Sequence, residues 1–453
     1  MPDVPEPLSL DPEEMRRLGY RVIDRIVDHL GELRELPPIR VGDAAELRAA
    51  VGGPPPEAPG EPDAALDALF EQVLPFVQHP DHPRFFARIG SPSNFMSVLA
   101  DLVTSGFNVF TGSWTGGSGP STVELVVLDW LRAICGLPEG SEGVLVTGGS
   151  VASLVGLAAA RTARFGDESS PRAVVLVSPE GHASVSRAAR ILGLEPRVLP
   201  ALTAETVRAA ADDSVFAVAA TAGTTSTGAV DPLSDLADVC AERGLWLHID
   251  GAYGAPAVLT ERGRAVLAGL ERADSLVLDP HKWLFQPYEI GCVLVREPEL
   301  LERTFALSGV YLRDTLGGEV NFRDRSVQLT RGGRALKLWL SIRTFGLAAF
   351  RDAIDHGIAL AEHAEAVLRE RPGWEVVTPA QLAIVCFRRD GDDELQTRLS
   401  AAMVADGFAA PSTTEVDGRV VLRLCTINPR TTFNDIEETI WRLDALSGSC
   451  ALP

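Results

Sequence analysis

Lysine is nearly missing from this chain of 453 residues. Of its 41 lysines and arginines only two are lysines, Lys282 and Lys337. Where plain positive charge suffices, arginine has replaced lysine, so a retained lysine is expected where an amine is required. A desolvated lysine can lose its proton and attack a carbonyl, whereas a guanidinium stays charged and forms no imine. The surroundings of these two residues therefore deserve comparison.

Positive charge is scarce as well, because the formal net charge is −21. A protein that binds nucleic acid needs a basic face, so a nucleic-acid partner is excluded, and an anionic membrane surface offers no attraction. The content of 46% hydrophobic and 23% charged residues is that of a folded globular protein, long enough for two or three domains.

Paired cysteines, metal-ligand spacings and long apolar runs are also absent from the sequence. The six cysteines are scattered without CxxC or CxH spacing, which predicts reduced core residues and no metal site. No apolar run reaches membrane-spanning length, and the first residues lack the basic and apolar regions of a signal peptide. We therefore expect a cytoplasmic protein without a membrane partner.

The chain divides into three parts by pattern. Residues 1–90 are expected to be mainly helical, beginning with a helix that Asp11 and Pro12 open and whose apolar stripe runs from Met15 to Leu30. That stripe needs cover from the same chain or from a second subunit. Residues 91–345 form a predicted large domain, and residues 346–453 a predicted smaller α/β domain.

From Gly143 onward, strand-like and helical runs alternate, which predicts a mainly parallel sheet flanked by helices. Ligands of such sheets bind beyond the carboxyl ends of the strands. Five predicted strands end in polar or glycine-rich segments, namely Thr147–Ser150, Ser178–His182, Thr221–Thr225, Asp250–Gly254 and Asp279–Lys282.

Each of these strand ends alone is weak evidence for a ligand site, since a glycine turn or a single histidine after a strand is usually structural. Together they match one ligand. Gly149 and Ser150, at a helix start, suit a phosphate, and the His182 imidazole suits the face of a flat ring. Asp250 suits a ring-nitrogen cation and Lys282 an aldehyde. That ligand is pyridoxal 5′-phosphate.

The sequence resembles the group II pyridoxal-phosphate decarboxylases of the aspartate-aminotransferase fold, in the branch of the aromatic L-amino acid decarboxylases. The most specific parts are the His-Lys-Trp core and the 32 positions between Asp250 and Lys282. The matching segments cover nearly the whole chain: His82–Phe86, Glu124–Trp130, Thr147–Ser153, His182, His248–Gly254, Pro280–Trp283 and Arg334–Trp339.

The resemblance implies a role for each matching residue. Lys282 would form the Schiff base, Asp250 would pair with the pyridinium nitrogen and His182 would stack on the ring. Gly149, Ser150 and His281 would lie near the phosphate, and Thr225 and Ala252 at the edge of the ring. Tyr311, on a long polar segment, would close over the site and protonate Cα, which favours amine over aldehyde as the product. The family's N-terminal element is exchanged between subunits, which implies a homodimer.

Two departures bear on the substrate and the site. Arg88, Ile89 and Gly90 stand where the family carries large rings of an aromatic substrate pocket, and Asp279 stands where asparagine is common. The expected activity is decarboxylation of an L-amino acid, with aromatic substrates favoured. The alternatives are an aminotransferase or another reaction on the same fold, and a catalytically silent homologue that binds the cofactor.

Overall fold

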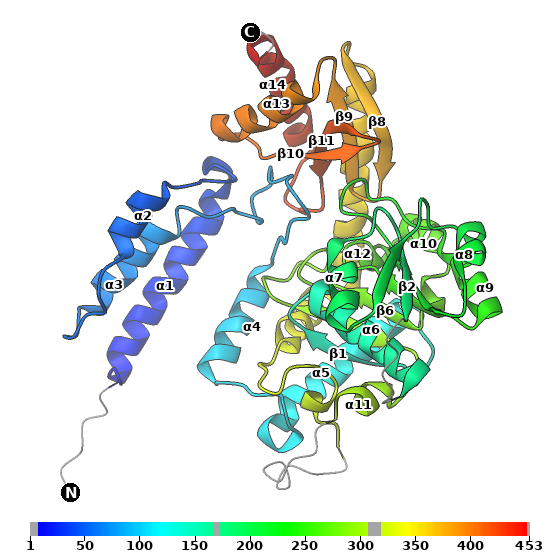
Figure 1. Cartoon of the computed structure of the whole chain (residues 1–453). Helices are drawn as coiled ribbons and strands as arrows, with labels where there is room; N and C mark the ends of the chain where they lie inside the picture. Colours follow the sequence, from blue (N-terminus) through cyan, green and yellow to red (C-terminus); the bar gives the residue numbers. More distant parts are fainter. Residues whose placement is uncertain (1–7, 167–172, 307–318, 451–453) are drawn as a thin grey trace, which may run out of the picture.

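The computed structural model describes residues 8–166, 173–306 and 319–450. Three groups of elements follow one another along the chain: an N-terminal helical group, a seven-stranded sheet with its helices, and a four-stranded sheet near the C-terminus. Figure 1 shows the first group beside the body of the molecule and the four-stranded sheet at one end of it.

The N-terminal group begins with helix α1 (Pro12–Glu32). It starts there because the Asp11 carboxylate accepts hydrogen bonds from the first free N–H groups, those of Glu13 and Glu14. No residue of α1 is buried. Helices α2 (Ala44–Val51) and α3 (Pro62–Ala68) pack beside it in Figure 1. Helix α3 is short, because it passes into a π-helical turn, Leu69–Val73.

Two helices connect this group to the large sheet. Helix α4 spans Phe95–Gly106 and packs along α12. Helix α5 spans Trp114–Ile134. The Ser113 hydroxyl caps its first turn by accepting from the Gly116 N–H, and the helix is interrupted at Gly117, whose backbone is not helical.

The large sheet has the order β1-β7-β6-β5-β4-β2-β3. Strands β6, β5, β4, β2 and β3 run parallel, and β7 is antiparallel to both of its neighbours, so β1 points the same way as β6. The strands are β1 (Glu142–Val146), β2 (Val174–Val177), β3 (Glu195–Val198), β4 (Val215–Thr221), β5 (Trp246–Asp250), β6 (Ser275–Leu278) and β7 (Gly291–Val295). The expected mainly parallel sheet is confirmed.

Helices flank this sheet, with α6 against β6 and β7 and α9 against β4 and β5. The central strands are buried on both faces, which explains their near-continuous apolar sequences. The helices are α6 (Gly149–Phe165), α7 (Ala183–Ile191), α8 (Ala204–Ala210), α9 (Leu233–Arg243), α10 (Glu261–Val266) and α11 (Leu300–Phe305).

The long helix α12 (Ala335–Arg369) leads to the C-terminal sheet and is interrupted at Gly346, whose φ of 72° suits glycine. The antiparallel sheet has the order β10-β11-β9-β8. Its elements are β8 (Trp374–Gln381), β9 (Ile384–Arg389), α13 (Asp393–Asp406), β10 (Ser412–Val416), β11 (Arg419–Cys425) and α14 (Phe433–Cys450). The domain boundaries at residues 90 and 345 stay predictions.

Two further properties concern the described part of the chain. Within it, no helix combines the length and the apolar character needed to cross a membrane. Cysteines 135, 240, 292, 386 and 425 are free thiols and buried, and burial raises the pKa of Cys135 and Cys240 to about 12.

Candidate active site

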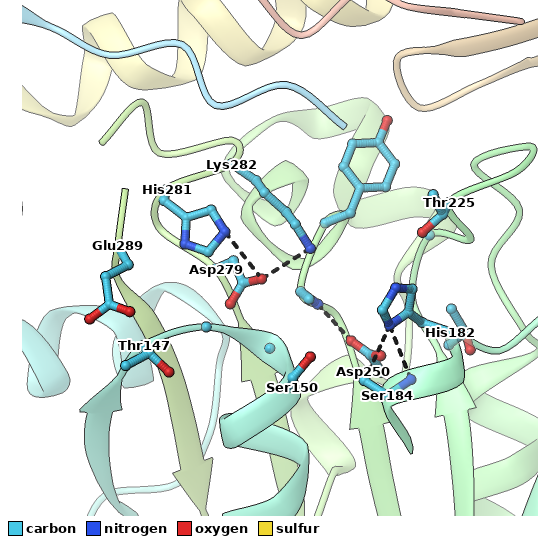
Figure 2. A pocket seen from close by; sticks show the side chains of 16 residues that line it. Thr147, Ser150, His182, Ser184, Thr225, Asp250, Asp279, His281, Lys282 and Glu289 are labelled. Atoms are coloured by element: carbon cyan, nitrogen blue, oxygen red, sulfur yellow. Dashed lines mark hydrogen bonds and ion pairs between the residues drawn. The ribbon is translucent and has the colours of Figure 1, made fainter. Parts of the chain in front are cut away.

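A cavity of about 340 Å³ lies at the carboxyl ends of β1, β2, β4, β5 and β6. Figure 2 shows side chains from these separate strand ends converging on it. Eight of the residues predicted from the sequence line it together: Gly149, Ser150, His182, Thr225, Asp250, Ala252, His281 and Lys282. They come together because the strands that precede them share one direction.

The glycine turn after β1 forms one wall of the cavity. It leads from Thr147 into α6, whose first N–H groups lack partners within the helix and whose positive dipole end faces the cavity. A Cβ atom on Gly149 would lie 3.0 Å from Asp279 Oδ2 and 3.1 Å from Ala252 Cβ. A Cβ atom here would crowd Asp279 and Ala252, and glycine leaves the backbone free to bind an anion.

Lys282 reaches the cavity from the loop after β6, and its Nζ lies 3.0 Å from Asp279 Oδ2. Burial alone would lower the pKa of the Lys282 ammonium. The negative charges of Asp279 and Asp250 outweigh burial and hold that pKa above its ordinary value. In the protein alone the amine is thus held as a cation at the base of the cavity.

Asp250 is the last residue of β5 and is 6% exposed. Burial raises the pKa of its carboxyl group, and the nearby Lys282 ammonium opposes that effect. One carboxylate oxygen accepts a hydrogen bond from the Ala252 N–H at 3.1 Å. A buried carboxylate that faces a cavity favours a ligand with a cationic nitrogen there.

His182 is the N-cap residue of α7. Its Nδ1 accepts a hydrogen bond from the Ser184 N–H and lies 2.7 Å from Ser184 Oγ, so the ring is fixed at the cavity wall. Thr225 lines the same wall from the loop after β4. Both side chains belong to exposed residues at the cavity mouth, where a ligand can reach them.

His281 lies on the opposite side, beside the glycine turn. Its Nδ1 is 2.7 Å from the Ile290 carbonyl oxygen, and its Nε2 is 3.6 Å from Asp279 Oδ2. Burial is the largest influence on His281 and lowers the pKa of its imidazole, so the ring is neutral at neutral pH. Because a carbonyl oxygen only accepts, the Nδ1 carries the proton.

Sequence reasoning did not assign several residues that the structure brings to the cavity. Asp279 contacts both His281 and Lys282, although the sequence marked it only as a departure from the family. The other unassigned lining residues are Thr147, Gly148, Ser184, Thr221, Gly223, Tyr253 and Glu289. For most of them the available signal was a position at or just after the end of a strand, and for Ser184 a position two residues after His182; Glu289, which precedes β7, had no such signal.

Other predicted residues lie elsewhere or outside the described residues. Tyr311 falls in residues 307–318, outside the described part of the chain, so its role stays a prediction. Arg88 is exposed and donates from Nη1 to Gln78 Oε1 at 3.2 Å. Arg88, Ile89 and Gly90 are not among the described residues that line the cavity. In the described part of the chain there is no group of three or more side chains suited to a metal ion.

The cavity fits pyridoxal phosphate on its own chemistry. The glycine turn leaves backbone N–H groups for a phosphate at a place where a Cβ atom would crowd Asp279 and Ala252. The amine of Lys282 can bind an aldehyde, and the buried carboxylate of Asp250 can pair with a ring-nitrogen cation. The buried Oδ1 of Asp279 has no hydrogen-bond partner among the described residues.

Comparison with known proteins gives a consistent result. Residues 51–390 match the family model described as the pyridoxal-dependent decarboxylase conserved domain. The chain is 43% identical to the aromatic-L-amino-acid decarboxylase of Bacillus atrophaeus, covering 98% of this chain and 97% of that protein.

Solved structures agree over the same length. The Catharanthus roseus tryptophan decarboxylase in complex with L-tryptophan superposes with a TM-score of 0.90 at 25% identity, covering 98% of this chain and all of that one. The Oryza sativa TDC with PLP and tryptamine gives a TM-score of 0.91 at 27% identity, with 97% and 99% covered.

Proposed function

The chain belongs to the pyridoxal-dependent decarboxylase family, and from this premise we propose that it converts an aromatic L-amino acid to the amine and CO2. Its cofactor is pyridoxal 5′-phosphate. The observation that carries the proposal is one cavity lined by the amine of Lys282, the carboxylate of Asp250 and the glycine turn. The aromatic substrate is supported by relatives named for aromatic amino acids and solved with tryptophan or tryptamine.

Each described residue has one physical task in this proposal. Lys282 Nζ holds the cofactor covalently until substrate arrives, and the N–H groups at the start of α6, with Ser150, bind the phosphate. Asp250 holds a proton at the ring nitrogen, and His182 packs on the ring face. The bound cofactor supplies the electron sink for cleavage of the bond between Cα and the carboxyl group.

A proton must then reach Cα of the substrate before the amine is released. We assign this proton to the phenol of Tyr311, as the resemblance implies. General acid catalysis of this kind contributes about a hundred- to ten-thousandfold. Tyr311→Phe should therefore still release CO2 while amine formation falls by that range, and aldehyde, ammonia and peroxide should appear in air. Amine at the parental rate without peroxide would remove Tyr311 from this role.

The test of the whole proposal is a panel of amino acids with separate measurement of CO2, amine and keto acid. Tryptophan, tyrosine and phenylalanine should each be compared with histidine, glutamate and alanine at equal concentration. Equal amounts of CO2 and amine from the aromatic substrates are expected. Keto acid without CO2 would identify an aminotransferase instead, and no product with a bound cofactor would identify a silent homologue.

Arg88 offers a sharper test of the substrate side chain. It stands where the resemblance leads us to expect a large ring, and it is exposed and bonded to Gln78. We propose that it is a rim residue rather than a reader of substrate charge. Arg88→Ala should keep the preference for aromatic over acidic substrates, and a loss of activity confined to one acidic substrate would contradict this assignment.

We also propose a homodimer, in which a second copy covers the N-terminal helices. Met15 is 50% exposed and Tyr20 69% exposed on α1, and large apolar side chains are also exposed at the end of α4, namely Leu102, Val103 and its C-cap residue Phe107. Stable obligate dimers bury about 2,000 Å² or more. Sedimentation should give a dimer at micromolar concentration, and an active monomer would contradict the proposal. The cytoplasmic compartment stays a prediction.

A further inference from the structure

Asp279 lies between the amine and the glycine turn of the cavity. Its Oδ2 is 3.0 Å from Lys282 Nζ and 3.6 Å from His281 Nε2, as the dashed lines in Figure 2 show. The same oxygen would be 3.0 Å from a Cβ atom on Gly149. The other oxygen, Oδ1, is buried without a hydrogen-bond partner among the described residues. The carboxylate thus borders the place where a phosphate would bind.

In the protein alone, Lys282 provides the donor for this carboxylate. His281 does not, because its proton is on Nδ1, bonded to the Ile290 carbonyl, and its Nε2 turns a lone pair towards Asp279. Among the other ionisable groups nearby, Glu289 lines the same cavity and Lys337 acts on His281 from α12. Asp250 faces the site from β5, and the Cys292 thiol from β7 has a pKa raised well above its usual range by burial.

Cofactor binding changes this balance, if the proposed function holds and the glycine turn binds the phosphate. The Lys282 nitrogen is then bonded to the cofactor and is no longer a free ammonium with three donors. At the same time a phosphate, whose oxygens are acceptors, arrives beside Asp279. Two acceptor groups that meet in a buried site are stable when they share a proton, as paired carboxylates do.

We propose that Asp279 and the phosphate of pyridoxal phosphate share one proton, so that the phosphate is bound as its monoanion, whose O–H donates to the Asp279 carboxylate, and cofactor binding takes up a proton. Asparagine, which the resemblance leads one to expect here, would donate from its amide without an added proton. The substitution Asp279→Asn is therefore a close isosteric control that changes only the source of the donated hydrogen.

The proton uptake has a definite sign with pH. A free phosphate monoester loses its second proton near pH 6, and an ordinary aspartate near pH 4, so above about pH 6 neither free partner holds the proton. Binding then removes one proton from solution. The ratio of the parental dissociation constant to that of Asp279→Asn should rise about tenfold per pH unit above pH 6.

The direct test is ³¹P NMR of the holoenzyme between pH 6.5 and 8.5. In the parent the phosphorus resonance should remain near the monoanion position at pH 7.5, and in Asp279→Asn it should move to the dianion position. A parental resonance at the dianion position throughout this range would overturn the proposal. This reading needs no variant, so it stands even where Asp279→Asn fails to fold.

A binding experiment separates the phosphate from the amine. Dissociation constants of pyridoxal phosphate and of pyridoxal, which lacks the phosphate, are measured at three pH values for both proteins. The parent-to-variant ratio should rise with pH for pyridoxal phosphate and stay flat for pyridoxal. Equal slopes for both ligands, or a flat ratio for both, would overturn the shared proton. Failure of both proteins to bind either ligand would contradict the proposed function itself.

Discussion

The large domain uses the same residue types in two different surroundings. At the cavity, Lys282 pairs with Asp279 at 3.0 Å; away from it, the buried Lys337 pairs with the partly exposed Asp101 at 2.8 Å. The two ion pairs are nearly alike in distance. The difference is that Lys282 lines an open cavity, whereas Lys337 also donates to the Pro287 carbonyl oxygen and is closed in by α4 and α12.

A second comparison lies on a single strand, between a buried histidine and an aspartate that lines the cavity. His248 and Asp250 lie two positions apart on β5, but His248 is buried beneath α6, where a Cβ atom on Gly156 would come within 2.9 Å of its ring, and Asp250 lines the cavity. The type of a residue and its ion-pair partner therefore do not tell a residue that takes part in the reaction from one that only stabilises the packing. Access to the cavity distinguishes the two kinds of residue. Substitutions at the cavity should change the activity, and substitutions in the interior should change the free energy of unfolding.

The largest effect is expected at the two lysines. Lys282→Ala removes the amine that holds the cofactor and should lower decarboxylation roughly ten-thousandfold or more, as loss of a covalent nucleophile does. Lys337→Ala should leave the covalent attachment intact. Borohydride reduction followed by peptide mapping checks both, with the label on the Lys282 peptide in the parent and in Lys337→Ala. A label on the Lys337 peptide would reverse the comparison.

The second-largest effect is expected on the free energy of unfolding, at a buried ion pair in the interior. Glu124 and Arg331 are fully buried and joined by two hydrogen bonds, of 2.6 and 2.9 Å, and Arg331 also donates to the Leu145 carbonyl oxygen. Breaking such a pair leaves an uncompensated buried charge and costs about 3–5 kcal/mol of unfolding free energy. Glu124→Gln should show that loss in denaturant unfolding.

A surface pair provides the control for this interior pair. Glu375 pairs with Arg419 where both side chains are nearly half exposed, and solvent weakens such pairs. Glu375→Gln should therefore unfold at nearly the parental denaturant concentration. The folded fraction of Glu124→Gln should still bind cofactor covalently, and loss of that binding without loss of stability would show that the interior pair belongs to the site.

A smaller effect, on the catalytic rate, is expected at Asp250 in the cavity. Asp250→Asn keeps the shape of the side chain but cannot hold a proton at the ring nitrogen by charge. Removing one such fixed electrostatic partner typically lowers kcat about a hundredfold or more. Asp101→Asn, at the partly exposed partner of Lys337, should leave kcat near the parental value. Comparable losses of kcat in Asp250→Asn and Asp101→Asn would show that lining the cavity gives Asp250 no larger role in the reaction than Asp101 has.

The sequence was sufficient for half of the cavity's lining residues, because those side chains follow apolar strands. Parallel strands place their carboxyl ends on one edge, so Ser150, Asp250 and Lys282 could be brought together without a structure. The role of Tyr311 stays a prediction, since it lies outside the described residues.

What the sequence did not reveal depends on contacts between distant segments or on edge strands. The approach of Asp279 to Gly149 joins residues far apart in the chain, and no local pattern encodes it. Strand β3 contains Pro196, and β10 is polar and half exposed, so neither has the apolar signature of a central strand. Both lie at sheet edges, where the burial that makes a strand recognisable is incomplete.

The smallest effect concerns His248, the interior counterpart of the cavity residues. Burial lowers the pKa of its imidazole to about 4 in the folded protein, from 6.5 when unfolded. Below pH 6.5 the unfolded chain binds a proton at His248 that the folded chain does not bind. The contribution of His248 to the free energy of unfolding is therefore highest above pH 6.5 and falls as the pH decreases towards 4. Between pH 7 and pH 5 the loss is about 2 kcal/mol by linkage.

His248→Gln should abolish this part of the pH dependence while the variant stays less stable at pH 7 through poorer packing. His82, whose pKa burial lowers to about 3, contributes in the same direction and remains in the variant. The slope should therefore decrease and not vanish. The measurement is urea unfolding of parent and variant from pH 5 to pH 7.5. Parallel curves for the two proteins would show that His248 binds its proton equally in the folded and unfolded states and would remove it from the comparison.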